Sequence, residues 1–89
     1  MFALIPTNQF KKDYKKCLKR KCIEQKIIDV LTYLSETGTV PDKYKPHKLS
    51  GNYKGFWECH IESDWLLIWE LLENEIKLVR TGTHSDLFK

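Results

Sequence analysis

An α+β fold is predicted for this 89-residue chain, with two helices packed on a small, mainly antiparallel sheet. Two neighbouring segments repeat apolar residues at helical spacing, and three later segments have the composition of strands. The length favours a single domain over residues 1–89, because a chain of this size builds one hydrophobic core. Its 42% hydrophobic and 30% charged residues are typical of a folded protein.

The first predicted element is a short strand over Phe2–Ile5, which ends at Pro6. Thr7 or Asn8 can cap the helix that follows. The apolar face of this helix is formed by Phe10, Tyr14, Cys17 and Leu18. Its other faces carry lysine side chains, namely Lys11, Lys12, Lys15, Lys16 and Lys19.

A second helix is predicted after a turn near Arg20–Cys22. Gly38 lies where its C-cap is expected, and the short link predicts that the two helices are antiparallel. The apolar residues that repeat in it are Ile23, Ile27, Val30, Leu31 and Leu34. The next segment, Thr39–Ser50, contains two prolines and no periodicity, so it is predicted to be a connecting loop.

Three strands are predicted in the second half of the chain, over Tyr53–Ile61, Trp65–Leu72 and Glu75–Thr81. The links between them are short enough for hairpins, so the three strands should form an antiparallel meander. The tail, Thr83–Lys89, has room for one helical turn.

The chain is expected to be cytoplasmic and to bind no membrane. It has no run of eighteen apolar residues, and its short apolar start lacks the features of a signal peptide. Cys17, Cys22 and Cys59 are odd in number and lack the spacing of a zinc site, so three free thiols are expected.

Side chains that can transfer protons or bind phosphate are concentrated in the second half of the chain. The meander places His60 and Arg80 at the same end of the sheet, and the turn over Thr81–Thr83 lets His84 fold back toward Asp64. Histidine titrates near neutral pH, and arginine binds phosphate in a bidentate manner. RNA supplies its own nucleophile, the 2′-OH group, so the set predicts metal-independent RNA cleavage without a cofactor.

Arg80 alternates with Ile76 and Leu78, which places it on an otherwise apolar strand face. An arginine there needs an anion, either a carboxylate or a ligand phosphate. Trp65 follows a turn and is the tryptophan most expected to be partly exposed, while Phe88 can stack on a base.

The charge is distributed unevenly along the chain. Residues 1–50 contain eleven Lys and Arg against five Asp and Glu, whereas residues 51–89 contain four against seven. A solvated helix face is the ordinary explanation of the lysines. The alternative is that Lys11, Lys15 and Lys19 contact the backbone of a nucleic acid.

Three motifs together resemble the YafQ branch of the RelE-type toxins of bacterial toxin–antitoxin systems, and the resemblance covers nearly the whole chain. They are the segment 44–51 with His47, the segment 58–68 with an H-x-E-x-D-W pattern, and the ending R-T-G-T-H-x-x-L-F over 80–88. The resemblance implies a RelE-like fold, cleavage of mRNA in the ribosomal A site, and neutralisation by a cognate antitoxin.

The resemblance also implies an active site. Its members are His47, His60, Asp64, Arg80, His84 and Phe88, with Trp65 adjacent to them. In the family the His and Asp side chains transfer protons, the Arg stabilises the phosphate, and the terminal aromatic residue helps to place the substrate. His84 is expected to be the principal acid or base, with His60 or Asp64 as its partner.

Two other functions remain compatible with the sequence. Toxins of the same fold related to ParE inhibit DNA gyrase by binding it, but they generally lack this set of His and Arg residues. A non-catalytic nucleic-acid-binding module would need only the lysine-rich helix.

Overall fold

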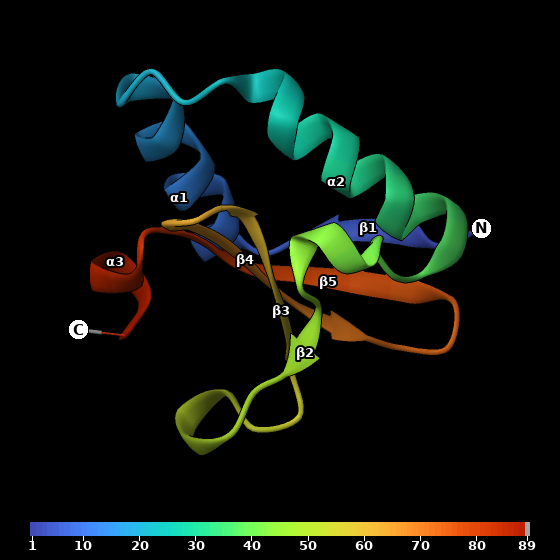
Figure 1. Ribbon diagram of the computed structural model, residues 1–89. Helices are drawn as coiled ribbons and strands as arrows, with labels where there is room; N and C mark the ends of the chain where they lie inside the picture. The colour runs from blue at the N-terminus through green and yellow to red at the C-terminus, as the bar shows by residue number, and fades with distance from the viewer. Residues whose placement is uncertain (89) are drawn as a thin grey trace.

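A computed structural model describes residues 1–88 of the chain, and it confirms the α+β fold (Figure 1). Its centre is a five-stranded sheet with the strand order β1-β5-β4-β3-β2. The strands are β1 (Ala3–Pro6), β2 (His47–Lys48), β3 (Trp57–Glu62), β4 (Trp65–Leu71) and β5 (Glu75–Gly82). β1 runs parallel to β5, and the other neighbouring strands are antiparallel.

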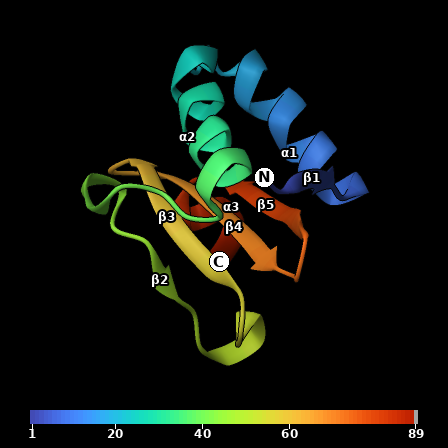
Figure 2. The same cartoon turned by 90° about the vertical axis from the view of Figure 1, so that its right-hand side faces the viewer.

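Two helices, α1 (Asn8–Lys19) and α2 (Glu24–Thr37), lie on the same side of the sheet (Figure 1, Figure 2). The Thr7 side chain accepts a hydrogen bond from the Phe10 N–H, and Gly38 ends α2 in a left-handed conformation, so both expected caps are confirmed. A third helix, α3 (His84–Phe88), follows β5, and two 3-10 turns, η1 (Asp42–Tyr44) and η2 (Gly51–Tyr53), flank β2.

The sheet has a core on each face. Ile27, Val30 and Leu34 of α2 are buried in a cluster that includes Leu67 and Trp69 of the sheet. On the opposite face, Leu87 of α3 packs in a cluster with Leu66 and Ile68. β4 is therefore buried on both sides, which explains why its sequence is almost continuously apolar.

A β-bulge in β5 turns Arg80 toward the α3 side of the sheet. Trp69 pairs with Leu78, but the next residue back on β4, Ile68, pairs with Arg80, so Val79 is the extra residue. Leu78 is part of the core under α1 and α2, whereas Arg80 shares its face with Ile68. The expectation that Arg80 lies on the face of Ile76 and Leu78 is therefore wrong, because the bulge interrupts the alternation.

The segment predicted as a loop contains the edge strand β2. His47 pairs with Glu58, and Lys48 pairs with Trp57. The strand was missed because two residues show no periodicity. The predicted start of the next strand at Tyr53 is also wrong, because Tyr53 belongs to η2 and β3 begins at Trp57.

The expectation of three free thiols is wrong. Cys17 and Cys22 form a disulfide that closes the turn between α1 and α2. Lys21 has a left-handed backbone conformation, which reverses the chain and brings the two Cα atoms to 5.6 Å. Cys59 is free and buried in the core, and burial raises the pKa of its thiol to about 12.

The helices of the described part of the chain, residues 1–88, are too short or too polar for any of them to traverse a bilayer.

Candidate active site

The three histidines form a row on the α3 side of the sheet. The ring centroids of His47 and His60 lie 6.2 Å apart, and those of His60 and His84 lie 5.8 Å apart. His47 comes from β2, His60 from β3, and His84 from the start of α3. Three segments that are separate in the sequence thus place their imidazoles side by side.

Asp64, in the turn between β3 and β4, holds His84 at one end of the row. Its Oδ1 atom accepts hydrogen bonds from the backbone N–H of His84 at 2.9 Å and from the imidazole Nδ1 at 2.7 Å. These bonds, the backbone one first, lower the pKa of the Asp64 carboxyl below its usual value. With Nδ1 engaged, the Nε2 atom of His84 is the ring nitrogen left for a substrate.

Glu58 holds His47 at the other end of the row and was missed by the sequence analysis. Its Oε1 lies 3.0 Å from Nε2 of His47, while Nδ1 of His47 lies 2.9 Å from the Lys45 carbonyl oxygen. Since both ring nitrogens face oxygen acceptors, the doubly protonated imidazolium is the form that donates to both. Glu58 is buried, and its Oε2 atom has no hydrogen-bond partner among residues 1–88. The available signal was its position two residues before His60, on the same strand face.

Arg80 is held by a carboxylate that the sequence analysis also missed. Its Nε donates to Oδ2 of Asp13 at 2.7 Å, and its Nη2 donates to Oδ1 at 3.2 Å. The backbone N–H of Thr81 donates to the same carboxylate at 3.2 Å. β1 ends opposite Leu78, so this amide has no strand partner, and Asp13 on α1 supplies the acceptor.

The outer edge of Arg80 faces the hydroxyl of Tyr53, whose ring in turn contacts Phe88. Its Nη1 lies 3.5 Å from the Tyr53 hydroxyl, and the Tyr53 ring contacts Phe88 edge-on with centroids 5.7 Å apart. The second N–H groups of Nη1 and Nη2 have no acceptor among residues 1–88 and can bind an anion. Phe88 lies four residues after His84, so α3 presents both side chains on one face.

Trp65 does not lie where the sequence analysis expected it. Its side chain is buried in the core under α1 and α2, and the indole N–H donates to the hydroxyl of Thr81 at 3.0 Å. The expected partial exposure is therefore wrong. Trp65 also lines a small pocket between α1 and the junction of β5 and α3.

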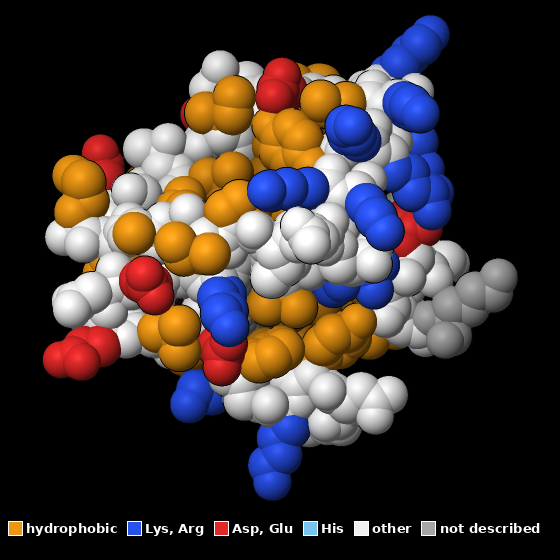
Figure 3. Space-filling view, turned by 180° about the vertical axis from the view of Figure 1, so that it is seen from behind, with side chains coloured by type: hydrophobic (Ala, Val, Ile, Leu, Met, Phe, Trp, Pro, Cys, Tyr) orange, Lys and Arg blue, Asp and Glu red, His pale blue; other side chains and the backbone are white. Residues whose placement is uncertain are grey.

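The lysines of α1 are exposed and gather on one side of the molecule, as Figure 3 shows from behind. The site-facing part of α1 is marked by Asp13, which reaches Arg80, and by Lys16 and Arg20, which reach Asp86 of α3. By helical spacing Lys19 lies beside this face, whereas Lys11 and Lys15 point away from it. The structure thus brings Lys16 and Arg20 to the site, although neither was chosen from the sequence.

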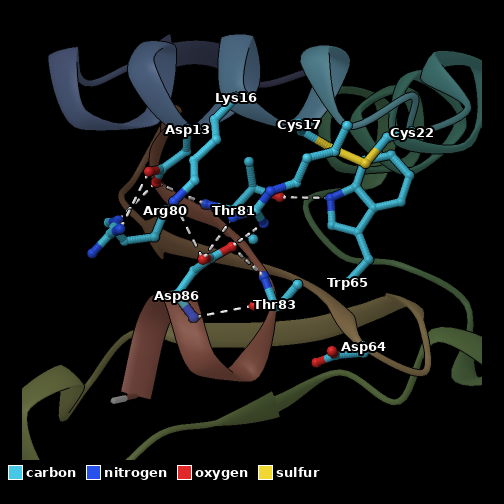
Figure 4. A pocket seen from close by; sticks show the side chains of 12 residues that line it. Asp13, Lys16, Cys17, Cys22, Asp64, Trp65, Arg80, Thr81, Thr83 and Asp86 are labelled. Carbon is cyan, nitrogen blue, oxygen red and sulfur yellow. Dashed lines mark hydrogen bonds and ion pairs between the residues drawn. A yellow bond between two sulfur atoms is a disulfide. The ribbon is translucent and has the colours of Figure 1, made fainter.

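A small pocket separates α1 from the junction of β5 and α3 (Figure 4). Residues from α1, the turn before β4, and the β5–α3 junction line it, and they include Asp13, Arg20, Asp64, Arg80 and Asp86. Within residues 1–88, no group of three or more His, Cys, Asp and Glu side chains has a geometry that could hold a metal ion.

Known proteins resemble this chain over nearly its full length. A family model described as "Bacterial toxin of type II toxin-antitoxin system, YafQ" matches residues 3–89. The mRNA interferase toxin YafQ of Escherichia coli strain K12 is 39% identical over 83 residues, which are 92% of this chain and 90% of that protein. The crystal structure of YafQ from E. coli strain BL21(DE3) is 34% identical with a TM-score of 0.92, and the match covers 100% of both chains. The E. coli DinJ–YafQ complex contains a chain that is 36% identical with a TM-score of 0.90, again covering 100% of both.

The Asp13→Ala variant is expected to lose about 3 kcal/mol of unfolding free energy. It leaves the partly buried Arg80 and the buried Thr81 amide without their acceptor, and breaking one side of such a pair has this cost. Urea denaturation measures the loss. Asp29→Ala, which removes an exposed carboxylate of α2, is the control and should change the free energy by about 0.5 kcal/mol at most. Equal small losses in the two variants would contradict the role of Asp13.

The Asp64 carboxyl is expected to titrate below the ordinary aspartate value of about 3.9. Because its pKa is lower in the folded chain, ionised Asp64 stabilises the fold above about pH 4, and this contribution is lost as the pH falls through the lowered value. Carboxyl carbon chemical shifts measure the midpoint. In His84→Ala the titration midpoint of Asp64 should rise only partly toward the ordinary value, because the backbone N–H of residue 84 still donates to the Asp64 carboxylate. A midpoint at or above the ordinary value in the unmodified chain would refute this account.

Proposed function

Because the chain belongs to the YafQ family of bacterial type II toxins, we propose that it is an endoribonuclease that cleaves mRNA and thereby stops translation. The observation that carries the proposal is the arrangement of His60, His84 and Asp64. Two imidazoles lie side by side, and a carboxylate orients one of them. Cleavage of RNA next to a 2′-OH group needs one group that accepts a proton and another that donates one.

The proposed reaction is attack of the 2′-oxygen on the adjacent phosphorus. A new bond forms between the 2′-oxygen and phosphorus, and the bond between phosphorus and the 5′-oxygen breaks. One imidazole takes the proton of the 2′-OH group, and the other gives a proton to the leaving 5′-oxygen. We assign these two roles to His84 and His60, because Asp64 is occupied in orienting His84.

The charge that grows on the phosphate needs cationic donors. Arg80 supplies them through the N–H groups that Asp13 and Tyr53 leave free, and Asp13 fixes the plane of its guanidinium. Glu58 holds the His47 ring at the other end of the histidine row, where its imidazole can contact the substrate. Phe88 is exposed at the end of α3 and supplies a surface on which a base can stack.

The substrate is proposed to be message held in the ribosomal A site. The exposed lysines of α1 form a cationic surface that continues outward from the site-facing side of this helix, and such surfaces bind nucleic-acid backbones without reading their sequence. Ribosomal RNA would occupy this surface while the message enters the site. Primer extension with and without ribosomes tests whether cleavage depends on the ribosome. Equal cleavage of free message would contradict the proposed ribosomal substrate.

A cognate antitoxin is the proposed protein partner. The E. coli relative forms a complex with DinJ, and this chain matches the toxin of that complex over its full length. We propose that a small antitoxin encoded beside the present chain binds it and suppresses cleavage. Titrating the neighbouring gene product into the cleavage reaction measures this.

His84→Ala and His60→Ala are each expected to lower the rate of mRNA cleavage by about 10²- to 10⁴-fold, the usual contribution of a general acid or base. Expression of either variant should therefore no longer arrest growth. Primer extension on a defined message measures the rate, and circular dichroism confirms the fold. Ser85→Ala, on the exposed side of α3, is the matched control and should cleave normally.

The same variants distinguish the other functions. Full toxicity of His84→Ala, together with inhibition of DNA supercoiling by the purified protein, would favour a gyrase inhibitor. Full activity after replacement of each histidine, with binding lost on replacement of α1 lysines, would favour a nucleic-acid-binding module.

A further inference from the structure

The shortness of α3 raises the question of what fixes His84 in place. α3 has five residues, and a helix of this length is not stable by itself. His84 is its first residue, and both His84 and its partner Asp64 are largely exposed. An exposed contact of this kind is too weak to hold a helix end. The position of the imidazole must therefore depend on other contacts of α3.

Asp86 provides one such contact at the start of the helix. Its Oδ2 accepts from the backbone N–H of Thr83 at 3.0 Å, and its own N–H donates to the Thr83 hydroxyl at 3.1 Å. This reciprocal pair is a capping box, which fixes the first turn of a helix. His84 lies inside the box, between its two members.

Asp86 also ties α3 to the end of α1. Arg20 donates to both of its carboxylate oxygens, from Nη1 to Oδ2 at 2.7 Å and from Nη2 to Oδ1 at 3.2 Å. Lys16 lies 3.4 Å from Oδ1, as Figure 4 shows. The Asp86 side chain is only 16% exposed. The bond from Arg20 is the largest cause of the lowered pKa of Asp86, so the carboxylate stays charged.

Both sides of this contact are fixed by the backbone. Arg20 is the C-cap of α1, and the turn that follows it is closed by the Cys17–Cys22 disulfide. Gly82 has a φ of +155°, and a Cβ atom there would lie 2.8 Å from Oδ2 of Asp86. Glycine thus permits the close approach of Asp86 to the end of β5.

We propose that Asp86, held by Arg20 and Lys16, is the positioning residue for His84: it fixes the first turn of α3 so that the imidazole stays beside Asp64 and His60. The inference rests on the catalytic role proposed for His84. Asp86 lies in the pocket between α1 and the β5–α3 junction, where Arg20 and Lys16 engage its carboxylate, so its proposed effect on His84 is exerted through the first turn of α3. Leu87 anchors α3 to the sheet, while Asp86 sets the direction of its first turn.

The test is a set of three variants, Asp86→Ala, Arg20→Ala and the double variant, in the ribosome-containing cleavage assay. Asp86→Ala should lower kcat by about 10- to 100-fold with KM within about twofold, because a shift of about 1 Å in a catalytic group costs that much. Arg20→Ala should lower kcat in the same direction. The double variant should be no slower than Asp86→Ala, because the two residues act through one contact. Arg20→Lys, which keeps the charge without the two-point grip, should recover part of the loss.

A spectroscopic readout separates positioning from general stability. The ring nitrogen shifts of His84 report whether Nδ1 remains bonded to Asp64, and both alanine variants should shift them toward those of a free imidazole. Glu62→Gln is the matched control, because it breaks the exposed Lys26–Glu62 ion pair between α2 and β3 and should alter neither readout.

Each outcome decides a different question. If His84→Ala cleaves normally, the catalytic role of His84 fails, whatever Asp86 does. If His84→Ala is inactive while Asp86→Ala and Arg20→Ala keep kcat and the His84 shifts, the positioning role is wrong. A loss that appears only in KM would also overturn it. If Asp86→Ala fails to fold, Arg20→Ala alone decides, since Arg20 lies at an exposed helix end.

Discussion

The structure depends on one buried carboxylate, that of Asp13. It accepts from the guanidinium of Arg80 and from the amide of Thr81, and so ties α1 to the part of β5 that extends beyond β1. Without an acceptor there, a buried strand amide and an arginine would both lack a partner, which is costly inside a protein. The contact also aims Arg80 at Tyr53. The fold and the candidate phosphate site therefore share one interaction.

Other cations of the chain are also paired with carboxylates inside the molecule. Arg20 and Lys16 belong to a strongly basic helix, but Asp86 engages them within the molecule, as Asp13 engages Arg80. The cations that fix the architecture are thus largely neutralised by carboxylates. The remaining lysines of α1 pair with no carboxylate of residues 1–88 and face solvent (Figure 3). The positive field of the basic half is consequently directed outward, where an RNA backbone can approach.

The sequence predicted the features that depend on a repeated residue pattern or on residues close together in the chain. Helical spacing predicted α1 and α2, and the predicted meander with its flexible turn placed His84 near Asp64, where the structure has it. The sequence-based prediction failed where the structure depends on a single residue or on a contact between residues far apart in the sequence. The bulge at Val79 reverses the facing of Arg80 and has no sequence pattern, and a strand as short as β2 has no period. Asp13 is 67 residues from Arg80, so only the tertiary fold reveals the pair.

Helix α3 contributes to both halves of the candidate site. His47 and His60 belong to the sheet strands β2 and β3, and Arg80 of β5 contacts Tyr53. α3 carries His84 at its first position and Phe88 one turn later, so a single docked turn completes the histidine row and the aromatic surface together. Because so short a helix has little stability of its own, the sheet core under Leu87 and the contact at Asp86 must hold it. The site is therefore complete only when the end of the described chain is docked.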